Sequence, residues 1–223
     1  MKSRPIAAGD GLRRTLRAGA IAAATLIFAQ PCLGLPSDPV GTTGSREALR
    51  TCHRGQAATE PEAGALLELS LDQADRAIAA DDGDALAHFA RFCALGEQAR
   101  RSGASLSSLV KLWQIREAVD RTLEIAPDYS DALHGKGAFL CSVPRLLGGD
   151  PDEGERLVRR ALEIDPEYVG ARLFLAERLR ERGDRAGAEA QVARALAAAE
   201  RKRDPAAIAK VQRFRETMAA APD

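Results

Sequence analysis

Histidine and cysteine are the residue types in this 223-residue chain that could carry chemistry, because both bind metals and both take part in catalysis. The three histidines are His53, His88 and His134, and none stands in an HExxH or paired CxxC spacing that would bind a metal. The sequence also contains no GxSxG nucleophile elbow and no GxxxxGK[ST] phosphate loop. We therefore expect no catalytic residue, no metal site, no cofactor and no enzymatic activity.

Residues 1–34 have the features of a secretory signal peptide. A basic start is followed by the apolar run "AGAIAAATLIFA" over residues 18–29. This run is too short to span a bilayer as a helix, which needs roughly 20 residues. Cys32 and Gly34 are small residues at the −3 and −1 positions of a cleavage site after Gly34, and cleavage after Ala29 is the alternative. The leader predicts export to the periplasm by the general secretory route.

The charge balance of the chain changes when this leader is set aside. The whole chain has a net charge of +0, and residues 1–34 hold five basic residues and one acidic residue, so residues 35–223 carry a net charge of −4. Binding to nucleic acid needs a concentrated positive surface, and so does binding to an anionic membrane face. We expect neither as a partner. Lipid anchoring through Cys32 is also disfavoured, because Pro31 stands where a lipidation signal has a small residue.

The chain matches itself at fixed offsets. "GDPDEGERLVRRAL" (149–162) aligns with "GDRAGAEAQVARAL" (183–196) at an offset of 34 residues, and "TLEIAPDY" aligns with "ALEIDPEY" at an offset of 39. This pattern resembles the tetratricopeptide repeat, a 34-residue helix-turn-helix unit. The small residues Ala188 and Ala195 would let the two helices of a hairpin cross closely, and Pro166 would close the preceding repeat.

The repeat predicts an all-α fold in which tetratricopeptide-like hairpins stack as a right-handed α-solenoid. We expect helices over residues 45–57, 63–80, 85–101, 106–125, 130–142, 151–164, 168–182, 185–201 and 205–219. The helix over 205–219 would be capped by Asp204, would begin at Pro205 and would cover the end of the stack, with an interaction helix as the alternative.

Two longer spacings predict where the array is irregular. The offset of 39 exceeds the repeat by five residues, which places an insert within "VPRLL" (143–147). In the same connection, Asp150 is expected to cap the next helix. An earlier spacing of 45 residues predicts one elongated hairpin, whose two helices each gain one to two turns and whose tip lies at residues 102–105.

Three cysteines remain after the leader, and all three fall on expected first helices of successive hairpins. In an exported protein, two of three cysteines usually form a disulfide. First helices lie side by side in such arrays, so we prefer a disulfide between Cys52 and Cys93. Pairing of Cys93 with Cys141 is the alternative, and the preferred pairing leaves Cys141 as a free thiol.

The inner face of such an array, which the first helices line, is where extended peptides commonly bind. The candidate groove residues on that face are His88, Arg91, Phe92, His134, Ala138, Arg172, Glu177 and Arg180. Trp113, the only tryptophan, stands among apolar residues, and we place it in the core, with contact to a ligand as the alternative. The insert residues Pro144, Arg145, Leu146 and Leu147 either fold back over their hairpin or offer a surface to a partner.

A second resemblance concerns the insert and the helix that follows it. "P-x-L-L-G-G-D-P" (144–151) ahead of "ALEIDPEY" is similar to the TRAP transporter T-component family. That resemblance implies an exported protein of tetratricopeptide-like hairpins that works with the substrate-binding subunit of a transporter. Some members of that family also oligomerise around a pore.

The sequence therefore predicts a signal peptide over 1–34, a linker over 35–44 and a helical-repeat domain over 45–223. The favoured function is an exported, non-enzymatic periplasmic scaffold that binds protein partners. The alternative is a T-component-like accessory that assists the uptake of a small ligand. A solute-binding protein or a second copy of the chain would then be the partner.

Overall fold

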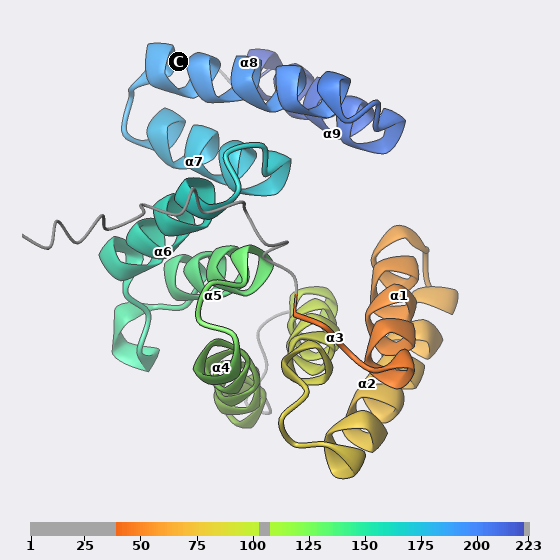
Figure 1. The fold of residues 1–223 in the computed structure, drawn as a ribbon. Coiled ribbons are helices and arrows are strands. Elements are labelled where there is room, and N and C mark those ends of the chain that lie inside the picture. The colour runs from red at the N-terminus through yellow and green to blue at the C-terminus, as the bar shows by residue number, and fades with distance from the viewer. Residues whose placement is uncertain (1–38, 103–107, 221–223) are drawn as a thin grey trace, which may run out of the picture. The chain divides into compact units, whose positions relative to one another are not determined.

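The computed structural model describes residues 39–102 and 108–220, and that part of the chain folds into nine α-helices and one short 3₁₀ helix (Figure 1). The α-helices are α1 (Thr43–Ala57), α2 (Glu62–Ala80), α3 (Ala85–Ser102), α4 (Ser108–Ile125), α5 (Ser130–Ser142), α6 (Pro151–Ile164), α7 (Val169–Glu181), α8 (Arg185–Arg201) and α9 (Pro205–Ala220). None of these helices is both long and apolar enough to cross a membrane. The predicted signal peptide and most of the predicted hairpin tip lie outside the described residues.

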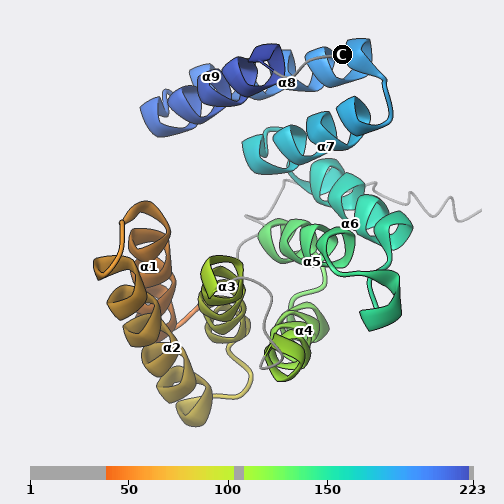
Figure 2. The ribbon, with the colours of Figure 1, turned by 180° about the vertical axis from the view of Figure 1, so that it is seen from behind.

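The helices form four hairpins, α1–α2, α3–α4, α5–α6 and α7–α8, and each hairpin packs on the next along the chain (Figures 1 and 2). The predicted all-α fold, a right-handed α-solenoid of stacked hairpins, is confirmed. Helices α3 and α4 have 18 residues each, against 13 in α5 and 14 in α6, as expected for an elongated hairpin. Helix α2 is longer still, with 19 residues, so long helices are not confined to one hairpin. Helix α9 packs on α7 and α8 through Val211, which is fully buried, so it caps the stack.

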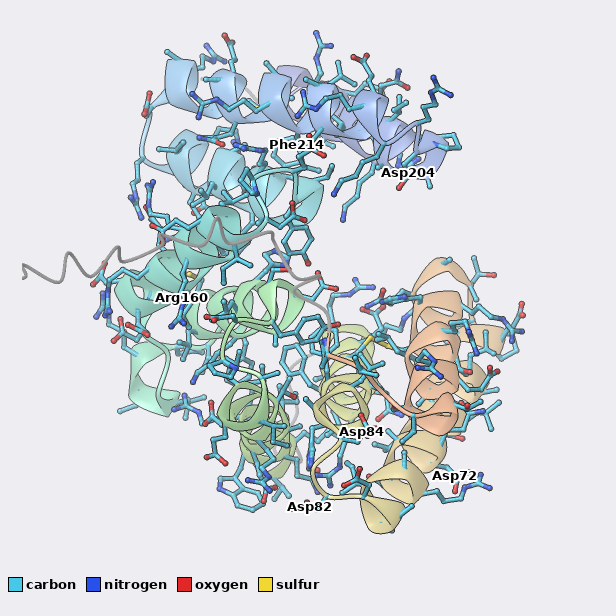
Figure 3. All side chains as sticks on the ribbon, viewed as in Figure 1. Asp72, Asp82, Asp84, Arg160, Asp204 and Phe214 are labelled. Atoms are coloured by element: carbon cyan, nitrogen blue, oxygen red, sulfur yellow. A yellow bond between two sulfur atoms is a disulfide. The ribbon has the colours of Figure 1, made fainter. Side chains whose placement is uncertain are left out.

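Aspartates set the start of several helices by accepting hydrogen bonds from backbone N–H groups that have no partner inside the helix. Asp150 Oδ1 accepts from the N–H groups of Asp152 at 3.1 Å and Glu153 at 3.0 Å, and Asp204 begins α9 in the same way (Figure 3). Both caps were predicted. Asp84 starts α3, and its Oδ2 also accepts from the Thr42 N–H at 3.0 Å. That bond fixes the residue before α1, which begins inside the predicted linker.

Small residues let the two helices of a hairpin approach closely. A Cβ atom on Gly154 of α6 would lie 2.6 Å from the Gly137 carbonyl oxygen and 2.6 Å from Cys141 Sγ, both on α5. A Cβ on Gly137 would in turn lie 2.5 Å from the Gly154 carbonyl oxygen. In the α7–α8 hairpin, Ala188 and Ala195 are fully buried against α7. The helix spacing within these hairpins therefore depends on residues with little or no side chain.

The predicted insert folds into a tight turn with a 3₁₀ helix over Arg145–Leu147. The Gly149 N–H donates to the Pro144 carbonyl at 3.1 Å, and the Asp150 N–H donates to the Leu140 carbonyl at 3.0 Å. Gly149 has no room for a side chain, because a Cβ there would lie 1.7 Å from the Val143 carbonyl oxygen. This turn ends α5 at Ser142, buries Val143 and leaves residues 144–147 on the surface.

Gly154→Ala is expected to lower the free energy of unfolding by about 2 kcal/mol, because the added methyl forces α5 and α6 apart and this cost exceeds the gain in helix propensity. Gly96→Ala on α3 is the matched control, since a Cβ at Gly96 meets nothing within 4 Å. That control should raise the free energy of unfolding by up to about 1 kcal/mol. Urea unfolding followed by circular dichroism measures both, and an unchanged midpoint for Gly154→Ala would contradict the close crossing.

Candidate functional site

A groove of about 640 Å³ lies along the first helices α1, α3 and α5, with α4 contributing side chains between α3 and α5. Tyr168, just before α7, and Lys210 of α9 also line the groove. The hairpin order produces this arrangement, because the first helices of successive hairpins share one side of the array. Phenylalanine, leucine and isoleucine side chains line it together with polar residues of the first helices.

Aromatic side chains form much of the groove surface. Phe89 and Phe92 of α3 stack with their ring centroids 5.8 Å apart, and Phe89 also meets the Tyr129 ring edge-on at 4.9 Å. Phe92 packs directly over Gly135 of α5, where a Cβ atom would lie 2.6 Å from a ring carbon. Phe139, one turn further along α5, is partly exposed in the groove. An apolar ligand surface would therefore meet ring faces and edges.

The groove is hollow where α3 and α5 carry small residues. Gly96 of α3 leaves open space, since a Cβ atom there would have no neighbour within 4 Å. Ala138 of α5 also lines the groove, and Leu112 and Ile115 of α4 border the same space. A large apolar side chain of a ligand would fill this volume and contact all four residues.

His134 on α5 is a neutral side chain next to this hollow. Its Nδ1 lies 3.1 Å from the Tyr168 hydroxyl, and its ring meets those of Tyr168 and Phe174 edge-on. Burial, with a smaller contribution from the positive charge of Lys210, lowers the pKa of His134 from 6.5 to about 4. Burial likewise raises the pKa of the Tyr168 hydroxyl. Both groups are uncharged at neutral pH, so this part of the groove offers hydrogen bonds without charge.

Charged residues in the groove are held by partners at the α1 end. Arg100 Nε donates to Glu97 Oε2 at 2.9 Å and Arg101 Nε donates to Glu97 Oε1 at 2.8 Å. Burial acts to raise the pKa of Glu97, but these hydrogen bonds and charges outweigh it and the pKa is lowered. Arg101 also donates to the Gly55 carbonyl at 3.1 Å and the Ala58 carbonyl at 3.2 Å. The network therefore joins α3 to the C-terminal end of α1.

A disulfide joins the same two helices. Cys52 of α1 and Cys93 of α3 are bonded, with their Cα atoms 6.4 Å apart and a sequence separation of 41. This is the preferred pairing of the two considered from the sequence. Cys93 lines the groove, and the Gln56 side chain donates to its sulfur at 3.5 Å. Cys141 is a free thiol, and burial raises its pKa.

The structure brings three of the eight candidate groove residues into the groove, namely Phe92, His134 and Ala138. The prediction that His88 and Arg91 line the groove is wrong, because both residues lie on another side of α3. His88 is buried with Nε2 3.0 Å from the Asp82 carbonyl oxygen, and Arg91 pairs with Asp75 at 2.9 Å. The helical phase explains this difference, since the α3 residues that line the groove follow Phe89 at intervals of three and four.

The three candidates on α7 do not line the groove either. Arg172 donates to the Pro166 carbonyl and to Gln191, while Glu177 and Arg180 pair with each other at 2.6 Å. Helix α9 covers this end of the array, since Leu173 of α7 packs in one cluster with residues of α9. The groove consequently ends at Tyr168 and Lys210.

Other residues that line the groove were not predicted from the sequence. They include Gly96, Glu97, Arg100, Asp131 and Phe139. A signal for the α3 members was present, because Gly96 and Glu97 follow Cys93 at i+3 and i+4 and so share its face of the helix. A glycine gives no chemical signal in a sequence, so the hollow that it creates appears only in the structure.

The prediction that Trp113 lies in the core is also wrong, because the residue is 63% exposed. Val110 and Glu117, three residues before and four residues after Trp113, are also exposed. Ile115 and Val119 form the buried side of the helix, so Trp113 lies on the solvent-facing side of α4. Of the four insert residues, Pro144, Arg145, Leu146 and Leu147, all are exposed, and Leu146 is 95% exposed.

Comparisons with known proteins agree with the helical-repeat architecture. Residues 146–213 match a family model described as Tetratricopeptide repeat, which covers less than half of the chain. Two crystal structures of MamA are each 16% identical to this chain. The first match covers 71% of this chain and 80% of the MamA chain, with a TM-score of 0.49. The second match covers 72% of this chain and 76% of the MamA chain, with a TM-score of 0.47. YrrB, described as a TPR protein with an unusual peptide-binding site, is 16% identical over 79% of this chain and 93% of its own, with a TM-score of 0.36.

No curated protein matches the chain significantly. The resemblance to the TRAP transporter T-component family is not confirmed by these comparisons. The family model supports tetratricopeptide repeats over the helices α6 to α9, where the 34-residue self-match of the sequence is strongest.

The lowered pKa of His134 predicts that the folded chain loses stability in mild acid. The unfolded chain binds a proton on this histidine below pH 6.5, whereas the folded chain resists protonation down to a pKa of about 4. Stability is therefore full above pH 6.5 and falls between pH 6.5 and 4, by about 2 kcal/mol at pH 5. His134→Gln should lose this share of the pH dependence in urea unfolding measured at pH 7 and pH 5.

His53→Gln is the control for this experiment, because it removes an exposed histidine of α1. Carboxylates with lowered pKa values, such as Glu97 and Glu155, lose their stabilising effect as the pH falls further, and they do so equally in the wild type and the variant. An identical pH dependence for His134→Gln and the wild type would contradict the prediction, because it would show that His134 is protonated as readily in the folded chain as in the unfolded chain.

Proposed function

We propose that this chain is a binding scaffold that takes an extended segment of a partner protein into the groove along α1, α3 and α5. The observation that carries the proposal is the open hollow over Gly96 and Ala138, which is bordered by aromatic and aliphatic side chains. Ligand sites are usually concave and lined mostly by apolar and aromatic side chains, with a few polar groups. The first helices of helical-repeat arrays commonly present such concave surfaces to partners.

The walls of the groove are fixed in place before any partner arrives. The Cys52–Cys93 disulfide and the contacts of Arg101 with the end of α1 hold α1 against α3. On the α5 side, Gly137 and Gly154 hold α5 tightly against α6. A preformed groove loses little conformational entropy on binding, which favours the capture of an otherwise flexible segment. The proposal assigns no reaction to the chain.

The proposed place of action is the periplasm. The basic and apolar leader over residues 1–34 supports export. The Cys52–Cys93 disulfide also supports it, because disulfides persist in oxidising compartments. We do not extend the proposal to a transporter accessory, since the groove gives no reason to prefer a solute-binding protein over other protein partners.

Export can be tested with the full chain expressed from Met1 in a Gram-negative host. The expected product is a periplasmic protein whose N-terminus is Leu35, determined by cell fractionation and intact mass. A signal-deleted chain that starts at Leu35 is the control and should stay in the cytoplasm. A full-length chain recovered from the cytoplasm would contradict export.

Peptide binding can be tested by filling the hollow from within the protein. Random 16-residue peptides displayed on phage are selected on the wild-type protein, and the affinities of synthetic copies are measured by fluorescence anisotropy. Gly96→Leu should weaken their binding by at least about tenfold, because the new side chain occupies the space of a buried ligand side chain. The fold should tolerate this change, since nothing lies within 4 Å of the new Cβ.

Ala190→Leu is the matched control, because Ala190 is an exposed position on α8 outside the groove. It adds the same side chain and should leave peptide affinity unchanged. Urea unfolding of both variants checks that each remains folded. If the selected peptides bind Gly96→Leu as tightly as the wild type, the groove is not their site and the proposal fails.

A further inference from the structure

Three exposed apolar side chains lie on α4 and on the insert. Val110 and Trp113, one turn apart on α4, are 65% and 63% exposed, and Leu147 of the insert is 45% exposed. We call these three residues the insert patch. Exposed large apolar side chains that gather in one place usually mark a contact surface. The fold has not covered them, even though the insert passes close to α4.

The insert patch is continuous with the groove. Trp113 and Leu147 line a depression of about 160 Å³ together with Leu112, Arg116 and Phe139. Leu112 and Phe139 also line the groove itself. Leu112 of α4 and Phe139 of α5 therefore form the border that the two hollows share. A chain lying in the groove can therefore continue over Leu112 and Phe139 onto the insert patch.

The insert is held in this position by a side chain of the neighbouring hairpin. The Arg116 guanidinium donates to the Gly148 carbonyl and lies over the Phe139 ring, 5.8 Å from its centroid. Gly148 has a φ of 88°, which favours glycine, and a Cβ there would lie 2.9 Å from the guanidinium. At the other side of the turn, Arg145 pairs with Asp152 at 3.1 Å. The exposure of Leu147 is thus a property of an anchored turn.

The size of the depression indicates what it would hold. Sites for small molecules usually have volumes of roughly 300–1,000 Å³. The depression is smaller than that, and it suits one apolar side chain rather than a whole ligand or a helix. Its position at the end of the groove points to a side chain from the same segment that fills the groove.

We infer that the partner segment carries two large apolar side chains, one seated over Gly96 and Ala138 and the other on Trp113 and Leu147. The segment crosses between them over Leu112 and Phe139, which border both hollows. This inference rests on the proposed function, since it gives the groove's ligand a second anchor. It also assigns a role to the five-residue insert that lengthens this repeat.

The sole tryptophan of the chain is a direct reporter of this second contact. Selected peptides that lack tryptophan are added to the wild-type protein until the groove is saturated. Burial of Trp113 should shift its emission to shorter wavelength. Saturation is established independently by anisotropy with labelled peptide.

Leu147→Gln and Trp113→Gln should each weaken binding of these peptides by about tenfold or more, because each removes an apolar surface that a large side chain contacts. Leu69→Gln is the matched control, since Leu69 on α2 is 44% exposed and Leu147 is 45% exposed. That control should bind as the wild type does. The exposure of all three positions means that none of these changes should disturb the core.

The outcomes separate this inference from the proposed function. If Gly96→Leu abolishes binding but Trp113→Gln and Leu147→Gln bind normally, with no change in Trp113 emission, the groove is used and the second anchor is wrong. If Gly96→Leu binds normally, the proposed function itself is wrong. Selected peptides with only one large apolar residue that still saturate the wild type at full affinity would likewise overturn the two-anchor inference.

Discussion

Close approach of paired helices is the constraint on which the rest of this structure depends. At the α5–α6 crossing, Gly137 and Gly154 bring the two backbones so near that neither position accepts a Cβ atom. The first helices of successive hairpins then share one side of the array, and the groove lies along that side. The groove is therefore a consequence of hairpin geometry, and several of its residues also pack between neighbouring hairpins.

Neighbouring hairpins are joined by quite different means along the array. Between α1 and α3 a covalent bond and the Arg101 hydrogen bonds provide the link, whereas α3 meets α5 through Phe92 on Gly135. His134 and Tyr168 then connect α5 to the start of α7. These contacts all lie at or near the groove surface. Ligand binding and the stacking of hairpins thus involve the same aromatic residues, and His134 makes the link sensitive to acid.

The sequence predicts the helices well and the groove only in part. Proline, aspartate caps and the 34-residue match are local signals, so the helices appear close to their expected bounds, as α5 does over Ser130–Ser142. Groove residues depend on helix phase, and His88 and Arg91 were assigned to the wrong side of α3 because neither self-match fixes the phase of that helix. Trp113 was misplaced for the same reason, because it lies on the exposed side of α4 together with Val110 and Glu117.

The open position at Gly96 has a consequence for how this protein can change. The shape of the hollow is set by missing side chains, whereas the stability of the array is set by buried residues elsewhere. A substitution at Gly96 alters which ligand side chain fits and leaves the core packing alone. At this one position, ligand preference can therefore change through evolution without a change in the packing of the core.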